Sequence, residues 1–298
     1  MQYINVDKYP IDRLSSLEGV AFIKSCREKM QQDGSLLLEG FIKSDCTAQM
    51  CSEVTGLYSH RRLEILNVLK RDSFFDKKIY DEELEDDHPA LFQMPQDVHA
   101  VASDLIPKTS MLRQVYDLPL VMNFIAAVVG EKEIFQFNDE FQALNVMYIK
   151  DGGSRAWHYD GSDYVVTLML QPSEEGGEFE FAPFIRGDKP GDERLEAVKQ
   201  LFSGNFPTKR TRCGAGALSI FNGRRSLHRV RTVFGKKIRI MSVLSYAKSP
   251  AEKSSPEKNI TLYGERVARI YEQRGEKISI NEDGSVIVPH INKTPSKL

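Results

Sequence analysis

The sequence is poor in the residues from which disulfide frameworks, zinc sites and membrane spans are built. Its four cysteines, Cys26, Cys46, Cys51 and Cys213, show no paired spacing typical of a zinc site or a disulfide-rich domain. We therefore expect reduced thiols in an intracellular protein. The longest apolar stretch, residues 118–129, is too short to cross a bilayer, so no membrane span is predicted.

The sequence also lacks a strong charge of either sign. Its formal net charge is −2 and its pI is about 6.3. Proteins that bind nucleic acid or an anionic membrane usually carry a broad basic surface, and we expect no nucleic-acid partner here. Residues 1–7 contain neither the basic nor the apolar segment of a secretory signal, so none is expected. The composition, 41% hydrophobic and 28% charged, is typical of a globular protein with a sizeable core.

Histidine is scarce, and two of the six histidines stand beside apolar, β-branched runs. His158 precedes the run 164–170, and His228 follows the run 218–221. In an extended strand residues i and i+2 face the same side, so His158 and Asp160 can reach one ion that His228 approaches from another strand. Two imidazoles and one carboxylate on one face of a metal are the ligand set of non-heme Fe(II) oxygenases. These three residues are the candidate metal ligands.

Arg239 adds a second charged group to this set. Between His228 and Arg239, residues 229–238 have the pattern of a strand, a short glycine-containing turn and a second strand. Such a hairpin, centred near residues 233–234, predicts that Arg239 lies roughly opposite His228. Its guanidinium would then bind a carboxylate through two hydrogen bonds close to the metal, as a chelating 2-oxo acid requires.

Each of these residues has a simpler explanation when taken alone. A His-x-Asp pair is more often a hydrogen-bonded feature of a strand, and a single strand arginine commonly extends its charge to water. Lys236 and Lys237 are typical turn lysines, although either is an alternative anchor if the hairpin register slips. The combination of both histidines, Asp160 and Arg239 favours the metal site.

In these motifs the chain resembles the Fe(II)/2-oxoglutarate-dependent dioxygenases, whose pattern is His-x-Asp, a distal His, and an Arg or Lys further along. The resemblance covers about residues 140 to 250. Within that superfamily, residues 226–230 and 242–246 resemble a group that hydroxylates or chlorinates free amino acids and related small molecules. The matching segments are 143–148, 157–160, 176–179, 214–221, 227–230 and Arg239.

The resemblance implies an α+β fold with a double-stranded β-helix, or cupin-like jelly roll, and an enzyme that uses Fe(II), 2-oxoglutarate and O₂. Fe(II) would be held by His158, Asp160 and His228. Arg239, helped by Tyr148, would hold the distal carboxylate of 2-oxoglutarate. Family halogenases have Gly or Ala at the position of Asp160, which leaves room for chloride. Asp160 therefore favours hydroxylation, or a related desaturation or ring closure, over halogenation.

The candidate substrate residues lie around the first metal ligand. Arg155 and Trp157 flank His158, and Glu140, beside Asp139, enters the preceding strand. Such acidic and basic groups would suit the ammonium and carboxylate of an amino acid. Taken alone, Trp157 is typical of a core ring, Arg155 of a rim charge and Glu140 of a solvated strand entry. A small molecule of secondary metabolism, a nucleoside and a lipid remain open as substrates, and a jelly-roll binding module without catalysis is the alternative function.

The hydrophobic pattern predicts one composite domain of three parts. Residues 1–135 are expected to be a mostly helical elaboration, residues 136–250 the catalytic β-helix, and residues 251–298 a C-terminal extension. The core strands are predicted near 142–150, 164–171, 177–183, 216–222, 225–233 and 237–247.

Capping and turn residues predict the elements around this core. A long helix is expected from Ser44 to about residue 70, and another helix is expected at 192–202 as an insertion that covers the sheet or the mouth of the site. After a polar link, one helix near 263–274 and a β-hairpin over 277–288 are expected.

The chain ends in Ser296, Lys297 and Leu298, the tripeptide that the peroxisomal import receptor recognises. The preceding polar residues 292–295 would present it freely. We expect this receptor as a partner and a peroxisomal location in a eukaryote, with the cytoplasm as the alternative. A frayed tail with an accidental ending is the simpler explanation.

Overall fold

The computed structural model describes residues 2–57, 84–94, 96–189 and 192–276. It also describes the backbone of four short strands: β2 (Arg62–Glu64), β3 (Asn67–Val68), β18 (Ser279–Ile280) and β19 (Val286–Ile287). In these parts of the chain, no helix combines the length and the apolar character that crossing a membrane requires.

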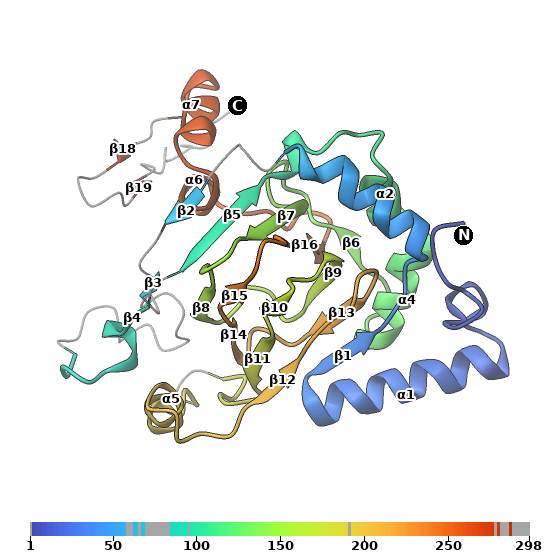
Figure 1. Ribbon diagram of the computed structural model, residues 1–298, viewed down its shortest axis with the longest axis horizontal. Helices are drawn as coiled ribbons and strands as arrows, with labels where there is room; N and C mark the ends of the chain where they lie inside the picture. Colours follow the sequence, from blue (N-terminus) through green and yellow to red (C-terminus); the bar gives the residue numbers. More distant parts are fainter. Residues whose placement is uncertain are drawn as a thin grey trace, which may run out of the picture.

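Seven antiparallel strands form the larger sheet, in the order β1-β13-β9-β16-β7-β5-β2 (Figure 1). Apart from β2, its strands are β1 (Ser35–Leu38), β13 (Leu218–Phe221), β9 (Val165–Gln171), β16 (Arg239–Leu244), β7 (Leu144–Ile149) and β5 (Asp97–Val101).

Four antiparallel strands form the smaller sheet, in the order β12-β11-β14-β8. They are β12 (Lys209–Thr211), β11 (Phe179–Ala182), β14 (Leu227–Val230) and β8 (Arg155–His158). Two-stranded pairs extend the roll: β10 (Glu175–Gly176) with β15 (Val233–Phe234), and β6 (Phe135–Gln136) with β17 (Tyr246–Ala247). β3 pairs with β4 (Gln93–Met94). The two sheets together form the predicted jelly-roll core.

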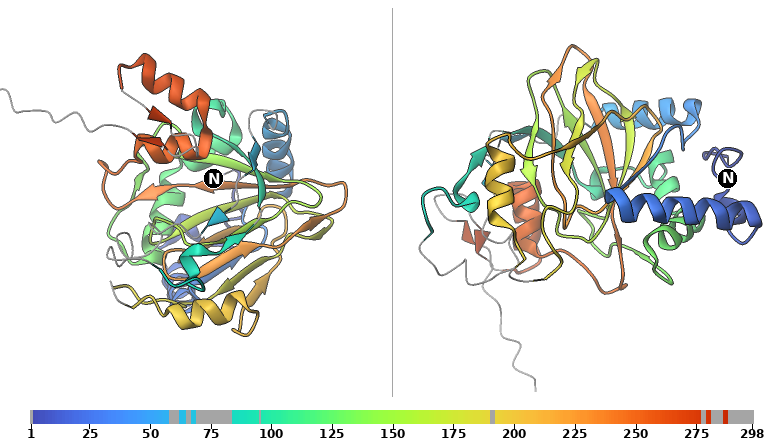
Figure 2. Two further views of the ribbon diagram at one scale, coloured as in Figure 1. Left: turned by 90° about the vertical axis from the view of Figure 1, so that its left-hand side faces the viewer. Right: turned by 90° about the horizontal axis from the view of Figure 1, so that it is seen from below.

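Helices cover the outer faces of both sheets. Helices α1 (Leu17–Asp33), α2 (Ser44–Thr55), α3 (Met111–Tyr116) and α4 (Pro119–Val129) share one hydrophobic core with the larger sheet. Helix α5 (Leu195–Phe202) packs on the smaller sheet, so the strands lie between α5 on one side and α1 on the other (Figure 2). Helices α6 (Pro256–Tyr263) and α7 (Glu265–Gln273) pack near β5. Short 3-10 helices occur at Ile11–Arg13, Pro89–Leu91 and Ser103–Leu105.

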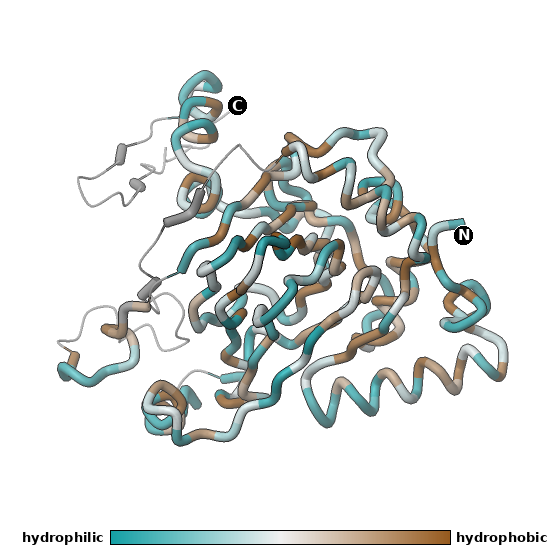
Figure 3. Tube along the Cα trace, viewed as in Figure 1, coloured by the Kyte–Doolittle hydropathy of each residue, from teal (hydrophilic) through white to brown (hydrophobic). Residues whose placement is uncertain are grey.

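Side chains alternate between the two faces of the larger sheet, as the period of a strand requires. On β7, Leu144, Val146 and Tyr148 enter the core beneath the helices, whereas Asn145 and Met147 line a cavity between the sheets. The amphipathic helices supply the other half of this core, and brown and teal segments alternate along α1 and α2 in Figure 3. The inner face is thereby left free for polar groups.

Most of the predicted elements are confirmed, and the reasons are local. All six predicted core segments contain strands, and the inserted helix is α5. The Ser16 side chain accepts a hydrogen bond from Gly19 N at 3.0 Å at the start of α1, and Gly34 ends this helix with φ 66°. β18 and β19 pair as the predicted C-terminal hairpin. Helix α5 covers the sheet rather than the mouth, because its buried residues pack against Trp157 and Leu227.

Two predicted features are wrong. The long helix from Ser44 ends at Thr55, and residues 62–64 and 67–68 are strands. The polar link after residue 250 contains α6, which begins with Ser255 as its N-cap and Pro256 in its first turn. The N-terminal segment contains α1 to α4, as a mostly helical segment should, and it also gives β1, β2 and β5 to the larger sheet.

Candidate active site

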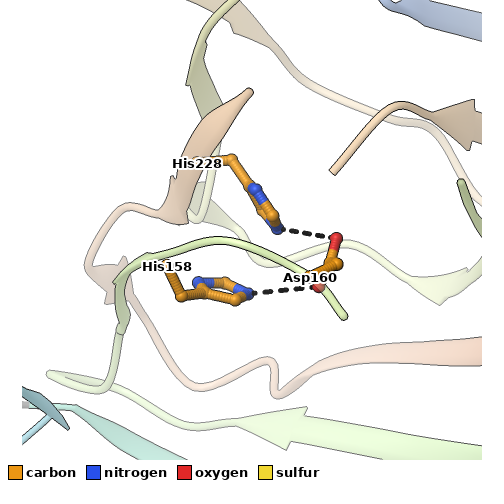
Figure 4. A group of neighbouring side chains, drawn as sticks. All are labelled: His158, Asp160 and His228. Carbon is orange, nitrogen blue, oxygen red and sulfur yellow. Dashed lines mark ion pairs between the residues drawn. The ribbon is translucent and has the colours of Figure 1, made fainter. Parts of the chain in front are cut away.

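His158, Asp160 and His228 meet at one end of the cavity. His158 ends β8 and lies directly opposite His228 on β14, and Asp160 follows β8 by two residues. His228 Nε2 lies 3.2 Å from Asp160 Oδ2, and His158 Nε2 lies 3.9 Å from Asp160 Oδ1. The three side chains point toward one another (Figure 4), and their ligand atoms all lie within 4.8 Å of one another. This arrangement fits a single metal ion bound on one face.

Backbone carbonyls hold both imidazoles in the orientation that a metal requires. His158 Nδ1 lies 2.8 Å from the Ala156 carbonyl oxygen, and His228 Nδ1 lies 2.9 Å from that of Ser226. A carbonyl only accepts, so each Nδ1 donates, and a ring in its neutral form then keeps a lone pair on Nε2, the atom directed at the centre. Burial, with Arg155 and His228 nearby, holds the pKa of His158 well below its usual value and favours this neutral form.

The Asp160 carboxylate is the anionic member of the set. Although burial raises its pKa, the imidazoles of His228 and His158 and the guanidinium of Arg155 lower it more, so the net shift is downward. Asp160 Oδ2 is buried and has no hydrogen-bond partner among the described residues. A buried carboxylate oxygen without a partner is costly, and a cation between Asp160 and the histidines would satisfy it. The donor set therefore fits a divalent metal.

Gly223 creates the space in which the Asp160 carboxylate lies. The Gly223 carbonyl accepts a hydrogen bond from Asp160 N at 3.1 Å. A Cβ atom on Gly223 would lie 1.7 Å from Asp160 Oδ2 and 2.6 Å from its Cγ. Any side chain at this position would push the carboxylate away from the histidines.

Substituting Gly223→Ala should therefore weaken metal binding by about 10–100-fold, the usual effect of disturbing the group that orients a ligand. Gly56→Ala is the matched control, because a Cβ atom there meets nothing within 4 Å and the residue has φ −71°. Metal titration of both variants by calorimetry checks this. Unchanged affinity in Gly223→Ala would show that the carboxylate is not a ligand in this position.

Arg239 lies in the same cavity, on the larger sheet. Its side chain is buried, and burial lowers its pKa to about 10, although Cys213 opposes the shift. Its Nε donates to the Gly177 carbonyl at 3.1 Å and its Nη2 contacts Met241 Sδ at 3.7 Å, and no carboxylate is paired with it among the described residues. A buried guanidinium with free donors requires an anion, so Arg239 fits the distal carboxylate of a 2-oxo acid.

Arg239 reaches this position by a different path from the predicted hairpin, which is wrong. β14 and β16 belong to different sheets, because Val233 and Phe234 pair with Glu175 and Gly176 instead of turning back. The chain crosses from one sheet to the other, and His228 and Arg239 both line the cavity. Lys236 and Lys237 are exposed on the turn and do not line it, so Arg239 is the anchor candidate.

The cavity between the sheets has a volume of about 270 Å³. Phe179 and Phe221 pack against the His228 ring with centroid distances of 5.4 and 4.8 Å, so apolar rings shield the metal ligands on this side. Hydroxyl groups on the larger sheet add polar lining. Thr167 and Ser219 supply these hydroxyls, and Cys213 and Met241, which lie near Arg239, also line the cavity.

Tyr148 does not line the cavity, so the predicted contact with 2-oxoglutarate does not fit its position. It lies on the helix-facing side of β7, fully buried, and its hydroxyl donates to the Val54 carbonyl at 2.7 Å. The strand period explains the error, because Met147 and Ile149 on the same strand face inward. Tyr148 instead fastens α2 to the larger sheet.

Of the three predicted substrate residues, only Arg155 lines the cavity. Trp157 faces the other side of β8, where it packs with α5 and where Arg229 lies 4.7 Å from its ring centre. Glu140 is exposed and forms a two-point ion pair with Arg274. The predicted substrate contacts of Trp157 and Glu140 do not fit these positions. Trp157 precedes His158 by one residue and therefore faces the opposite side of the strand. Glu140 is already paired with Arg274.

Helix α6 supplies residues that the sequence did not indicate. Lys258, Leu262 and Tyr263 line the cavity together with Gln142 and Asn145 of the core. Asp139 fixes this helix, because its Oδ2 accepts from Asn259 Nδ2 at 2.9 Å and from Ser254 N at 3.2 Å. The sequence did contain a signal for this helix. Ser255 followed by Pro256 is a typical helix start, but it lies in a segment of linker-like composition.

Comparisons with known proteins agree with this geometry. The chain matches the family model Halogenase D over residues 82–263, more than half of its 298 residues. Among solved structures, it resembles the non-heme alpha-ketoglutarate-dependent epimerase SnoN of nogalamycin biosynthesis, with a TM-score of 0.52 and 13% identity over 76% of this chain and 81% of that chain. It also resembles AviO1 from Streptomyces viridochromogenes Tue57, with a TM-score of 0.52 and 14% identity over 78% of this chain and 97% of that chain.

No curated protein matches the sequence. At these identities the solved structures show the fold. The family model shows the family, and the range it matches contains all three candidate ligands, Arg239 and α6. The chain therefore belongs to the Halogenase D family, and the membership of the Fe(II)/2-oxoglutarate-dependent dioxygenases that its motifs predicted is confirmed.

Proposed function

We propose that this enzyme hydroxylates an unactivated C–H bond of a small molecule, with Fe(II) as cofactor and 2-oxoglutarate and O₂ as cosubstrates. The observation that carries the proposal is one cavity that holds His158, Asp160 and His228 together with the buried Arg239, which pairs with no carboxylate among the described residues. A binding module gains nothing from this combination, whereas a dioxygenase of this type requires each member.

Each residue has a distinct task in this proposal. His158, Asp160 and His228 would hold the metal, which when bound supplies the oxidation of 2-oxoglutarate to succinate and CO₂ that accompanies insertion of one oxygen atom into the C–H bond. Arg239 binds and orients the distal carboxylate, so the 2-oxo acid end is directed toward the metal ligands. Phe179 and Phe221 exclude water from the side of His228.

The family name makes halogenation the competing reaction, and Asp160 argues against it. The carboxylate occupies the position that halogenases leave open for chloride, and Gly223 lies where any larger residue would displace it. Three protein ligands leave positions for 2-oxoglutarate and O₂ but no additional one for a halide. Desaturation and ring closure use the same ligand set and remain alternative outcomes of the proposed reaction.

The cavity favours a small substrate, and we propose a metabolite of secondary metabolism, the setting of the similar epimerase SnoN. Its volume of about 270 Å³ lies just below the range of roughly 300–1,000 Å³ that is usual for small-molecule sites, and the cosubstrate takes up part of it. A lipid or a nucleoside fits this space less well than an amino acid or a similarly small metabolite. We therefore propose a compact polar substrate.

The test of the proposed function is a screen of metabolites with the Fe(II)-loaded enzyme, 2-oxoglutarate and O₂. We expect succinate release that depends on one class of small molecules, and a product that has gained one oxygen atom or lost two hydrogen atoms by mass spectrometry. If the product gains chlorine in place of oxygen, the proposed hydroxylation is wrong and the enzyme is a halogenase.

Arg239→Ala should raise the concentration of 2-oxoglutarate required for half-maximal succinate formation by at least about tenfold, since a hydrogen-bonded charge pair contributes roughly 1.5–3 kcal/mol. Lys237→Ala is the control, because Lys237 is exposed and outside the cavity. Kinetic titration of both variants checks this. Equal 2-oxoglutarate requirements in Arg239→Ala and the wild type would remove Arg239 from the binding site.

The import tripeptide Ser296, Lys297 and Leu298 lies outside the described residues. Peroxisomal import through its receptor therefore stays a proposal, supported by the sequence alone.

A further inference from the structure

Arg186 is a buried charged residue to which the proposed reaction gives no task. It lies between β11 and α5, with only 2% of its surface exposed, and the carboxylate of the buried Glu193 is 3.5 Å from its Nη1. The cost of removing two charges from water commonly offsets their attraction, so a buried ion pair contributes little net stability. Stability alone therefore does not explain why a guanidinium lies here.

The guanidinium of Arg186 stacks on the ring of Tyr159, the residue between His158 and Asp160. Its Cζ atom lies 3.6 Å from the centre of this ring. His158 is still part of β8, but Asp160 lies beyond the end of the strand, so strand pairing does not fix its position. Because Tyr159 is covalently linked to both ligand residues, a fixed Tyr159 ring restricts the backbone rotations that would turn the Asp160 carboxylate away.

Arg186 also holds the turn that faces Asp160. Its Nε donates to the Arg224 carbonyl at 2.7 Å, and its backbone N donates to the Arg225 carbonyl at 3.3 Å. Arg224 directly follows Gly223, whose carbonyl accepts the hydrogen bond from Asp160 N. One arginine thus contacts the neighbours of both partners in this hydrogen bond. A planar guanidinium can stack on a ring and donate in its own plane at the same time, which an ammonium group cannot do.

We propose that Arg186 is a positioning residue for the metal centre. It fixes Tyr159 against the turn 223–225, and it thereby keeps the Asp160 carboxylate directed at the two histidines. The inference rests on the proposed function, which assigns the metal to the three candidate ligands. Arg186 is not one of the described residues that line the cavity, so it acts through its neighbours and not on the metal or the substrate directly. Its loss should change both the affinity and the coordination geometry of the metal.

Calorimetric titration of the metal-free protein with Zn(II) tests this without turnover. Arg186→Met should weaken Zn(II) binding by about 10–100-fold, the usual effect of removing a group that orients a ligand. Arg186→Lys should not restore the wild-type affinity, because the ammonium group lacks the planar face. Arg113→Met is the matched control and should bind Zn(II) like the wild type. Arg113 also donates to a backbone carbonyl, that of Ser103, at 2.6 Å, but it belongs to α3, which contributes none of the described cavity residues.

The visible absorption of bound Co(II) distinguishes positioning from a loss of stability. At saturating Co(II), in protein shown to be folded by circular dichroism, Arg186→Met should give a spectrum that differs from that of the wild type, because the Asp160 carboxylate is displaced. A purely structural role would lower the unfolding temperature and leave the spectrum unchanged, as we expect for Arg113→Met. If Arg186→Met does not fold, Tyr159→Leu removes the same stacking contact from the other side and should weaken Zn(II) binding by about tenfold.

Failure of the wild type to bind Zn(II) would contradict the proposed function itself. The inference on Arg186 is overturned if the wild type binds Zn(II) and the folded Arg186→Met variant keeps the wild-type affinity or the wild-type Co(II) spectrum. Restoration of both by Arg186→Lys would also overturn it. Where Arg186→Met does not fold, wild-type Zn(II) affinity in Tyr159→Leu has the same consequence.

Discussion

Replacing His228 by alanine should abolish metal binding and succinate production together. His228 supplies Nε2 at 3.2 Å from Asp160 Oδ2, and its ring is fixed by the Ser226 carbonyl and by Phe179 and Phe221. Removal of an orienting partner alone commonly costs 10–100-fold in metal affinity, so removal of the ligand itself should cost at least about 100-fold. Metal content after desalting and succinate measured by mass spectrometry check both effects.

The control for this substitution is the stability of the metal-free protein. His228 is buried, so the thermal unfolding of the metal-free variant has to be compared with that of the metal-free wild type. A folded variant that lacks metal supports the assignment. Wild-type turnover in a folded His228→Ala variant would refute it, and His158→Ala should behave in the same way because its Nε2 is directed at the same centre.

The clustering of the three candidate metal ligands was predictable from the sequence because strand geometry fixes their positions locally. His158 and Asp160 are two residues apart at the end of a strand, and His228 lies beside an apolar run that is typical of a sheet. Core strands were predictable for the same reason, since β-branched and alternating residues identify them without knowledge of their partners. The pairing of strands depends on distant segments, and for this reason the hairpin between His228 and Arg239 was predicted wrongly.

The sequence also did not predict which face of each core strand points into the cavity. Tyr148 and Trp157 lie on core strands near the ligands, but both face the helices rather than the cavity. A buried strand is hydrophobic on both faces, so its pattern does not separate them. Helix α6 was missed for a different reason, because it is short, follows a polar segment and depends on tertiary contacts such as that of Asp139 with Asn259.

Gly223 and Lys258 illustrate contributions that no motif marks. Gly223 is important because it lacks a Cβ atom. A Cβ atom at this position would lie 1.7 Å from Asp160 Oδ2. Lys258 follows the ligand Asp160 by many residues and reaches the site through the fold of the C-terminal helices. Gly223 borders the motif residue Asp160 and Lys258 Nζ lies beside Gly161, so both are found only when the fold is known.

Replacing Asp160 by glycine should remove oxygenation by at least about 100-fold without producing a chlorinating enzyme. The substitution deletes the anionic ligand and opens space against Gly223 in which a halide can lie. Space alone does not place the substrate hydrogen and carbon in line with the halide, because the other side chains that line the cavity are unchanged. Asp86→Gly, which changes an exposed aspartate outside the cavity, is the matched control.

Succinate, hydroxylated product and chlorinated product should be measured by mass spectrometry at high chloride for the wild type and both variants. We expect no chlorinated product from the wild type, because Asp160 fills the position beside His228. A chlorinated product from the wild type would show that the carboxylate leaves the metal during the reaction, which would overturn the role given to Asp160. Efficient chlorination by Asp160→Gly would instead mean that an open ligand position is sufficient, and that the geometry of the substrate was already suited to halogenation.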